Sequence, residues 1–373
     1  MLVNGGQIGN AQEPVPYILG AIYNLTGSQA GLDVPSAQGA RLAVEESNHR
    51  GDLLKHPVHL IIEDGESRPA VVKRKAAAML QQFPSTLALM GLSDTDMVLA
   101  AAPVAASNKK LFLTSGATSP RLPAQVPGYL FLACFGDNVQ AAAGAEWAYQ
   151  DLSARTVAIL FNASESYTRL LQKYFQTSFR QLGGQVLSVV SYTSKDDLSQ
   201  SIRNLRKADF IYFAAMPEDV LQGVQLLRQA GFPAPILGGD AFDSEELWAK
   251  HPEVSDVYFT THAYLGPDNP DPQVVAFRKA YARAYPGSTP DPFAALGYDA
   301  TRLVMTAWSR VESTNPSDMR QALAGIRRFQ GVTGTISYAD GSRIPKKSVT
   351  ILRVERGQRQ LVRQLLPSRV PPP

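Results

Sequence analysis

The sequence predicts an α/β protein built from two doubly wound parallel sheets. From residue 17 onward, short apolar runs alternate with longer amphipathic segments, which is the pattern of βα units. This rhythm ends near residue 135 and then starts again. A chain of 373 residues is also too long for one typical core. We therefore expect two lobes, each with its own sheet.

The first lobe is expected to repeat the strand–helix unit. Pro35 is predicted to begin a helix, because proline fits the first helical turn. The predicted strands cover residues 17–23, 58–62, 87–90, 111–113 and 129–134, and the predicted helices cover residues 35–48, 69–82 and an alanine-rich segment that ends at residue 108.

The second lobe follows the same rule. Its predicted helices cover residues 139–150, 166–182, 198–207, 218–230 and 244–250, and its predicted strands cover residues 156–161, 185–192, 210–214, 235–237 and 257–261. The later helices, at residues 272–285, 292–309 and 316–327, and the few strands after Gly334 cannot enclose a third core. We expect them to pack on the two sheets.

Such packing requires the chain to cross between the lobes three times, near Phe135, Tyr264 and Thr333. Parallel crossing segments form a hinge, since a few residues can absorb a closing motion. The predicted division is residues 1–135 plus 265–332 for the N-terminal lobe and 136–264 plus 333–373 for the C-terminal lobe, with a ligand cleft between them.

Composition excludes several classes of protein. With 45% hydrophobic and 18% charged residues, the chain is typical of a globular protein. Its net charge of +3 is spread without basic blocks, so no nucleic-acid partner is expected. The single cysteine, Cys134, excludes an internal disulfide and is expected to be buried. His56 and His59 lack a nearby third ligand, so we expect neither a metal nor a cofactor.

The two ends of the chain carry weaker signals. Residues 1–16 are polar and glycine-rich, without the basic and apolar regions of a secretion signal, and no apolar run is long enough to span a membrane. Either the protein stays in the cytoplasm or a leader has been removed. Residues 367–373 are expected to form a poorly ordered tail.

The stretch at residues 111–120 is the first candidate for a binding site. A short apolar strand ends there in hydroxyl residues and a glycine. Ligands of open α/β sheets lie just beyond the carboxyl ends of strands. Gly116 would allow a ligand close to the main chain, and Ser115, Thr118 and Ser119 offer hydroxyl groups. The alternative is an ordinary turn after a strand.

The sequence lacks the common motifs of catalysis. It has no Gly-x-Ser-x-Gly nucleophile motif, no P-loop, and no Gly-x-Gly-x-x-Gly fingerprint after a strand. We therefore do not expect an enzyme.

Five ordered segments carry a family resemblance, at residues 21–27, 38–44, 100–105, 114–120 and 226–231. In their order and spacing the chain resembles the type I periplasmic solute-binding proteins of the leucine/isoleucine/valine-binding group, the receptors of branched-chain amino-acid ABC importers. The resemblance implies a monomeric, periplasmic or otherwise extracytoplasmic receptor whose signal peptide is not part of this sequence. It would trap a small amino acid or related metabolite by lobe closure and dock on membrane permease subunits. The alternative is a sensor or regulator of the same fold, for an amide or a small organic or aromatic acid.

The resemblance also implies how a zwitterion would be held. Thr95 would bind the ligand's carboxylate, and Thr118 would offer its hydroxyl and N–H. The carbonyl of Gly116 and the carboxylate of Asp240 would bind the α-ammonium. This division agrees with electrostatics, because a buried charge without a partner costs several kcal/mol.

Other positions depart from the family pattern. Ser93, Asp94 and Asp96 stand near a serine pair of the family, Met216 replaces a frequent tyrosine, and Leu32 replaces an aromatic residue. These changes leave the ligand's side chain open. With the aromatic wall positions included, the candidate ligand-binding residues are Ser93, Asp94, Thr95, Ser115, Gly116, Thr118, Tyr167, Met216, Asp240 and Tyr298.

Several of these residues also have a purely structural interpretation. Asp240, Asp94 and Asp96 precede predicted helices and could cap them, since aspartate is favoured at that position. Tyr167 and Tyr298 lie on predicted helices and could belong to the core.

Overall fold

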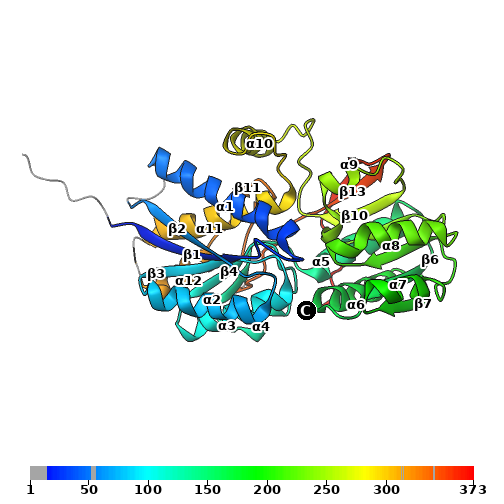
Figure 1. The fold of residues 1–373 in the computed structure, drawn as a ribbon, viewed down its shortest axis with the longest axis horizontal. Helices are drawn as coiled ribbons and strands as arrows, with labels where there is room; N and C mark the ends of the chain where they lie inside the picture. Colours follow the sequence, from blue (N-terminus) through cyan, green and yellow to red (C-terminus); the bar gives the residue numbers. More distant parts are fainter. Residues whose placement is uncertain (1–14, 52–55, 312, 314, 339–340) are drawn as a thin grey trace, which may run out of the picture.

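The computed structural model describes residues 15–51, 56–311, 313, 315–338 and 341–373. Two α/β lobes lie side by side, as Figure 1 shows. The expected fold class of two sheet-containing lobes is confirmed. The sequence-based interpretation of residues 1–16 falls almost entirely outside the described residues.

The N-terminal lobe contains, within the described residues, a five-stranded parallel sheet of order β2-β1-β3-β4-β5. Its inner strands are almost entirely buried on both faces, as expected when helices cover both sides. The strands are β1 (Tyr17–Tyr23), β2 (Val58–Asp64), β3 (Thr86–Gly91), β4 (Leu111–Thr114) and β5 (Leu130–Leu132).

Helices pack on both faces of this sheet. Alternation along β1 directs Leu19, Ala21 and Tyr23 to one apolar cluster and Ile22 to the other. The first face is covered by α1 (Ala30–Arg50), α10 (Pro272–Ala284), α11 (Pro292–Val311), α12 (Pro316–Ala324) and the hairpin β11 (Phe329–Gly331)–β12 (Gly334–Ile336), and the second by α2 (Pro69–Gln82) and α3 (Thr95–Ser107), with α4 (Leu122–Gln125) nearby.

Helix α1 begins earlier than the sequence predicts. It starts at Ala30, so Pro35 lies inside the helix and not at its beginning. The extra turn is held by tertiary contacts, because the buried carboxylate of Asp33 accepts a hydrogen bond from the backbone N–H of Asn24 at 2.8 Å. A local signal at Pro35 could not reveal that contact.

The C-terminal lobe contains, among the described residues, a seven-stranded sheet of order β14-β13-β10-β9-β8-β6-β7. Five strands are parallel, namely β6 (Thr156–Asn162), β7 (Gln185–Tyr192), β8 (Phe210–Ala214), β9 (Ile236–Gly238) and β10 (Val257–Thr261). Its helices are α5 (Asp137–Gln150), α6 (Ser166–Gln181), α7 (Lys195–Ile202), α8 (Pro217–Gln229), the 3₁₀ helix η1 (Asp240–Phe242) and α9 (Glu245–Ala249).

The last two strands, β13 (Val349–Glu355) and β14 (Gln358–Leu365), run antiparallel on the edge of this sheet. The expectation of purely parallel sheets is therefore wrong for this edge. Arg356 and Gly357 join the two strands with φ angles of 50° and 73°. Such a two-residue turn closes a hairpin, and a hairpin pairs its strands antiparallel.

The chain passes between the sheets after β5, after β10 and before β13. The third passage lies near Lys347 and not near Thr333, because β12 and Tyr338 still pack in the N-terminal core. The Tyr338 hydroxyl donates to the carbonyl of Leu132 at 2.7 Å. Residues 333–338 and 341–346 thus pack with the first lobe.

The buried side chain of Lys347 fastens two of these passages together. Its Nζ donates to Thr333 Oγ1 at 2.5 Å and to the Ala133 carbonyl at 3.4 Å. Burial lowers the pKa of Lys347 to about 8. The hinge is therefore bonded internally and does not consist of independent linkers.

The C-terminal segment lies against helix α5, contrary to the expectation of a poorly ordered tail. Ser368 bonds through its N–H and hydroxyl to Glu146 Oε2, both at 2.9 Å, and Asn138 Nδ2 donates to the Pro371 carbonyl at 2.8 Å. These partners lie on a helix distant in sequence, so local composition does not reveal them. The chain ends close to the junction of the lobes (Figure 1).

Helices α1 and α11 approach each other unusually closely. A Cβ atom on Gly39 would lie 1.9 Å from the Ala294 carbonyl oxygen, and one on Gly297 would lie 1.9 Å from the Ser36 carbonyl oxygen. Only glycine fits at these two positions, since the backbone of the partner helix occupies the space of a side chain.

We predict that Gly39→Ala destabilises the protein by about 1–3 kcal/mol, the usual cost of overpacking. The helices must separate to admit the methyl group. Gly31→Ala is the matched control in the same helix, because a Cβ added there would meet no atom within 4 Å. Denaturant unfolding monitored by circular dichroism should show a lower free energy of unfolding for Gly39→Ala than for the wild type, and no decrease for Gly31→Ala. Equal midpoints would contradict the packing argument.

Candidate functional site

A small pocket lies between the lobes. It lies where the strands β3, β4, β8 and β9 end, as expected for ligand sites of parallel sheets. The N-terminal lobe contributes Leu32, Ser93, Asp94, Thr95, Thr118 and Phe293, and the C-terminal lobe contributes Tyr167, Met216, Pro217, Asp240 and Ala241.

The loop between β3 and α3 forms one polar wall. Asp94 caps α3, accepting hydrogen bonds from the N–H groups of Asp96 at 2.9 Å and Met97 at 3.1 Å, and it also lines the pocket. The capping interpretation of Asp94 is therefore confirmed. Thr95, 3% exposed, is the first residue of α3, and its hydroxyl has no hydrogen-bond partner among the described residues.

The pKa of Asp94 is raised to about 7. Burial is the main cause, the charges of Asp96 and Glu165 add to it, and the hydrogen bonds from backbone N–H groups oppose it. Asp94 is therefore close to half protonated at neutral pH.

The stretch after β4 contributes fewer side chains to the pocket than its composition suggests. Ser115 is buried within the N-terminal lobe, where its hydroxyl lies 3.1 Å from Ser36 Oγ, and it does not line the pocket. Gly116 packs beneath the neighbouring loop, since a Cβ there would lie 2.8 Å from Ser93 Oγ. The side chain of Thr118 does line the pocket.

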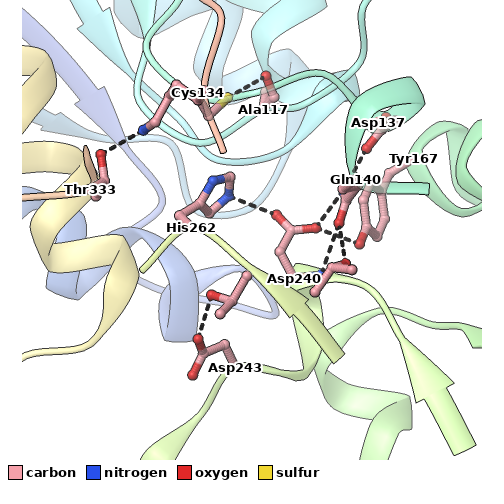
Figure 2. Close-up of polar contacts among 12 residues, drawn as sticks. Ala117, Cys134, Asp137, Gln140, Tyr167, Asp240, Asp243, His262 and Thr333 are labelled. Atoms are coloured by element: carbon pink, nitrogen blue, oxygen red, sulfur yellow. Dashed lines mark hydrogen bonds and ion pairs between the residues drawn. The ribbon is translucent and has the colours of Figure 1, made fainter. Parts of the chain in front are cut away.

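The opposite wall centres on Asp240, which is 4% exposed. Figure 2 shows its carboxylate held by three side chains. Its Oδ1 accepts hydrogen bonds from Tyr167 Oη at 2.7 Å and Gln140 Nε2 at 2.9 Å, and its Oδ2 lies 3.1 Å from His262 Nε2. Asp240 begins the short helix η1 without a capping bond, so its carboxylate does not have the capping role that was the alternative.

Asp240 is ionised in this environment. Burial alone would raise its pKa, but the hydrogen bonds from His262, Tyr167 and Gln140, and the charge of His262 at the acidic pH where that ring is protonated, bring the pKa below its ordinary value. Burial and the charge of Lys347 together lower the pKa of His262 more than Asp240 and Asp243 raise it, so the imidazole is neutral near pH 7. An ionised carboxylate only accepts hydrogen bonds, and His262 Nε2 must therefore carry the proton.

Gln140 and His262 were not among the sequence candidates. His262 directly follows β10, just as Asp240 follows β9 after one further glycine, and that position was an available signal. Its ring stacks on Phe135 with centroids 4.0 Å apart. Gln140 gives no local signal, because its partners Asp240 and Thr260 are 100 or more residues away in sequence.

A second buried acid, Asp137, lies behind this network. Its Oδ1 accepts a hydrogen bond from Gln140 Nε2 at 2.9 Å, so one amide bridges two carboxyl groups. Burial and the charge of Asp240 raise the pKa of Asp137 to about 7. The backbone N–H of Asp137 donates to the Thr118 carbonyl at 2.7 Å, which links the network to the opposite wall.

The two tyrosine candidates lie in different environments. Tyr167 lines the pocket and also belongs to the apolar core of the C-terminal lobe. Tyr298 does not line the pocket: its hydroxyl donates to Glu46 Oε2 at 2.6 Å and its ring lies 5.0 Å from that of Phe277. Tyr298 is therefore a core residue, as its structural interpretation expected. Four residues that were not candidates also line the pocket, namely Leu32, Pro217, Ala241 and Phe293.

Within the described ranges, no group of three His, Cys, Asp or Glu side chains could hold a metal ion. His56 instead bonds to the Val15 carbonyl at 2.9 Å. Cys134 is buried, as expected, with its Sγ 3.3 Å from the Ala117 carbonyl oxygen. None of the helices in the described part of the chain is long and apolar enough to cross a membrane.

A polar pocket shared by two lobes across a hinge is the arrangement of a receptor that closes on a small solute. The sequence matches the model of the periplasmic binding proteins over residues 16–359. The chain belongs to the periplasmic binding protein family. Members of this family are binding proteins and not enzymes, which agrees with the missing catalytic motifs.

Individual relatives support this assignment. A Leu/Ile/Val-binding protein homologue of Brucella melitensis is 25% identical over 345 residues, which cover 91% of this chain and 92% of the relative. A leucine-binding protein of Thermotoga maritima is 28% identical, and its structure superposes with a TM-score of 0.84 over 94% of this chain and 99% of its own. A protein of Rhodopseudomonas palustris in complex with 3,4-dihydroxybenzoic acid shares the fold at 19% identity, with a TM-score of 0.83 over 95% of this chain and 99% of its own.

We predict that stability falls as pH rises from about 4 to about 7, in part because of Asp94. Its pKa is about 7 when folded against an ordinary 3.8, so the folded state retains a proton that the unfolded chain has released. Each unit of this difference corresponds to about 1.4 kcal/mol. Asp94→Asn keeps a good cap and removes the titration, so its stability relative to the wild type should increase across this pH range.

Thermal unfolding of both proteins at intervals from pH 4 to pH 8 checks this. Asp271→Asn is the matched control, because it makes the same cap substitution at the exposed start of α10. Because the pKa of Asp137 is also raised to about 7, part of the decrease in stability with rising pH should remain in the Asp94→Asn variant. Parallel curves for the wild type and Asp94→Asn would contradict the role of Asp94.

Proposed function

We propose that this protein is the solute receptor of an ABC importer and binds a small aliphatic α-amino acid between its lobes. The ionised, buried carboxylate of Asp240 is the observation that carries the proposal. A buried anion opposite unpaired hydroxyl groups suits a ligand with a cationic end and an anionic end.

The α-ammonium group would bind Asp240. A carboxylate offers about four acceptor positions. Three are used by Tyr167, Gln140 and His262, and only one of these lies on Oδ2, so Oδ2 has acceptor capacity left. The carbonyl of Gly116 stays a proposed second acceptor for the ammonium.

The α-carboxylate would bind on the N-terminal lobe. The hydroxyls of Thr95 and Thr118 line this wall, which lies at the positive end of the α3 helix dipole. Ser93 and Asp94 complete the wall, and partial protonation of Asp94 limits its repulsion of a carboxylate. The two ends of a zwitterion thus contact different lobes, so a bound ligand favours closure as a population shift.

The ligand's side chain would contact an apolar wall formed by Leu32, Met216, Pro217, Ala241 and Phe293. An aliphatic side chain suits this lining, and the relatives from Brucella melitensis and Thermotoga maritima are named for binding the branched-chain amino acids or leucine. An aromatic acid would place no cation against Asp240, and the protein that holds 3,4-dihydroxybenzoic acid shares only the fold with this chain.

The receptor role has consequences for location and partners. We infer a periplasmic or otherwise extracytoplasmic protein that acts as a monomer and delivers its ligand to permease subunits in the membrane. The family assignment supports this proposal.

We predict that Asp240→Asn weakens the binding of leucine, isoleucine or valine by more than about tenfold, because the ammonium loses its buried counter-charge. Isothermal titration calorimetry of the purified protein with the three amino acids, and with 4-hydroxybenzoate as the competing class, measures this directly. Tighter binding of 4-hydroxybenzoate than of every amino acid would contradict the proposal.

Tyr298→Phe is the matched control for this experiment. The substitution removes a buried hydroxyl from a residue that lies outside the pocket. Amino-acid affinity should stay within about twofold of the wild type, since no lining contact changes. A thermal-shift measurement confirms that both variants are folded.

A further inference from the structure

A second cavity, of about 230 Å³, adjoins the amino-acid pocket and shares Thr95 with it. We call it the side pocket. The N-terminal lobe contributes Thr95, Leu99, Ser119, Arg121 and Gln125, and helix α6 of the C-terminal lobe contributes Ser166, Arg169, Leu170 and Lys173. It therefore also spans the two lobes.

The charge of the side pocket is opposite to that of the amino-acid pocket. Arg121, Arg169 and Lys173 line it, and no carboxylate does among the described residues. The amino-acid pocket is lined by Asp94 and Asp240 and by no cationic side chain of the described chain. An anionic group that extends past Thr95 would therefore move from acidic to basic surroundings.

One of the three cations is positioned by neighbouring groups. Arg169 donates to the Ala163 carbonyl at 2.6 Å and to Ser166 Oγ at 2.9 Å, which holds its guanidinium at the start of α6. Arg121 comes from the opposite lobe, and its charge opposes the rise that burial causes in the pKa of Tyr174 on α6.

A buried hydroxyl group gives the side pocket its second, independent feature. Ser119 is 1% exposed, and its hydroxyl has no hydrogen-bond partner among the described residues. A buried hydroxyl without a partner is unfavourable, so a ligand that accepts a hydrogen bond from it is bound more tightly. An oxyanion accepts hydrogen bonds from hydroxyls and guanidinium groups alike.

We propose that the side pocket is an oxyanion subsite, which binds either a distal carboxylate of the ligand, beyond its α-carbon, or a free inorganic anion beside it. Part of this inference deepens the proposed function, because a ligand's own distal carboxylate requires the amino-acid pocket to hold its ammonium. The free-anion form does not depend on amino-acid binding.

Two probes distinguish the sources of the anion. Leucyl-glycine carries an ammonium at one end and a distal carboxylate at the other, and inorganic phosphate is an anion alone. The test variant is the double substitution Arg121→Gln, Lys173→Gln, and Lys207→Gln is the control, because it removes an exposed charge before β8, at the opposite end of the strand from the cleft. All titrations use one ionic strength, since exposed charges are screened by salt.

If the ligand supplies the anion, leucyl-glycine should bind the wild type and the control at least about tenfold more tightly than the double variant, while leucine changes less than threefold. If the anion is free, phosphate should raise the melting temperature of the wild type and the control above that in sodium chloride, and not that of the double variant. Ser119→Ala should reduce this phosphate-dependent rise in melting temperature.

The subsite is refuted if neither probe separates the wild type from the double variant. That result leaves the amino-acid proposal intact whenever leucine, isoleucine or valine still binds the wild type. Conversely, a protein that binds none of these amino acids but shows the phosphate effect would refute the proposed function and retain the subsite.

Discussion

The structure depends on the stabilisation of one buried negative charge. Asp240 is ionised with 4% of its surface exposed, and this is possible only because Tyr167, Gln140 and His262 surround it with hydrogen-bond donors. These residues come from α6, from α5 and from the segment after β10. Since removing a partner from a buried charge costs several kcal/mol, the network fixes the relative positions of those elements. The site is thus preorganised before any ligand arrives.

The same network links the binding site to the hinge. His262 lies directly after β10, where the chain leaves the C-terminal lobe, and its ring stacks on Phe135 of the first passage. Lys347 of the third passage bonds to Ala133 and Thr333. All three passages therefore lie within a few contacts of the group that would hold the ligand's ammonium. A ligand that binds Asp240 would therefore affect side chains that are packed against the hinge itself.

The sequence predicts most of the fold and only part of the site, for a physical reason. Strands and helices follow from local periodicity, and Thr118 could be identified because ligands gather where parallel strands end. Asp240 was identified only through the family resemblance. Gln140 could not be found, because its role depends on partners 100 or more residues away on other elements. Tyr298 occupies a buried helical position whether its ring faces a ligand or the core, and only the packing of α1 on α11 decides in favour of the core. The third passage was misplaced for a related reason, since the bond from Tyr338 to Leu132 joins segments distant in sequence.

Closure of the cleft also uses contacts that the protein supplies without a ligand. The N-cap residue of α6, Glu165, makes no capping bond, and the backbone N–H of Ser166 lies 3.4 Å from Asp96 Oδ2 of the opposite lobe. A carboxylate near the start of a helix is favourable, and this one is available only when the lobes meet. Asp96 and Glu165 nevertheless repel each other and Asp94, as the raised pKa values of Asp94 and Glu165 show, the main cause being burial. The closed form therefore balances one favourable contact against several like charges. The cationic end of the proposed ligand would relieve the negative charge of the cleft, and so would favour the closed form.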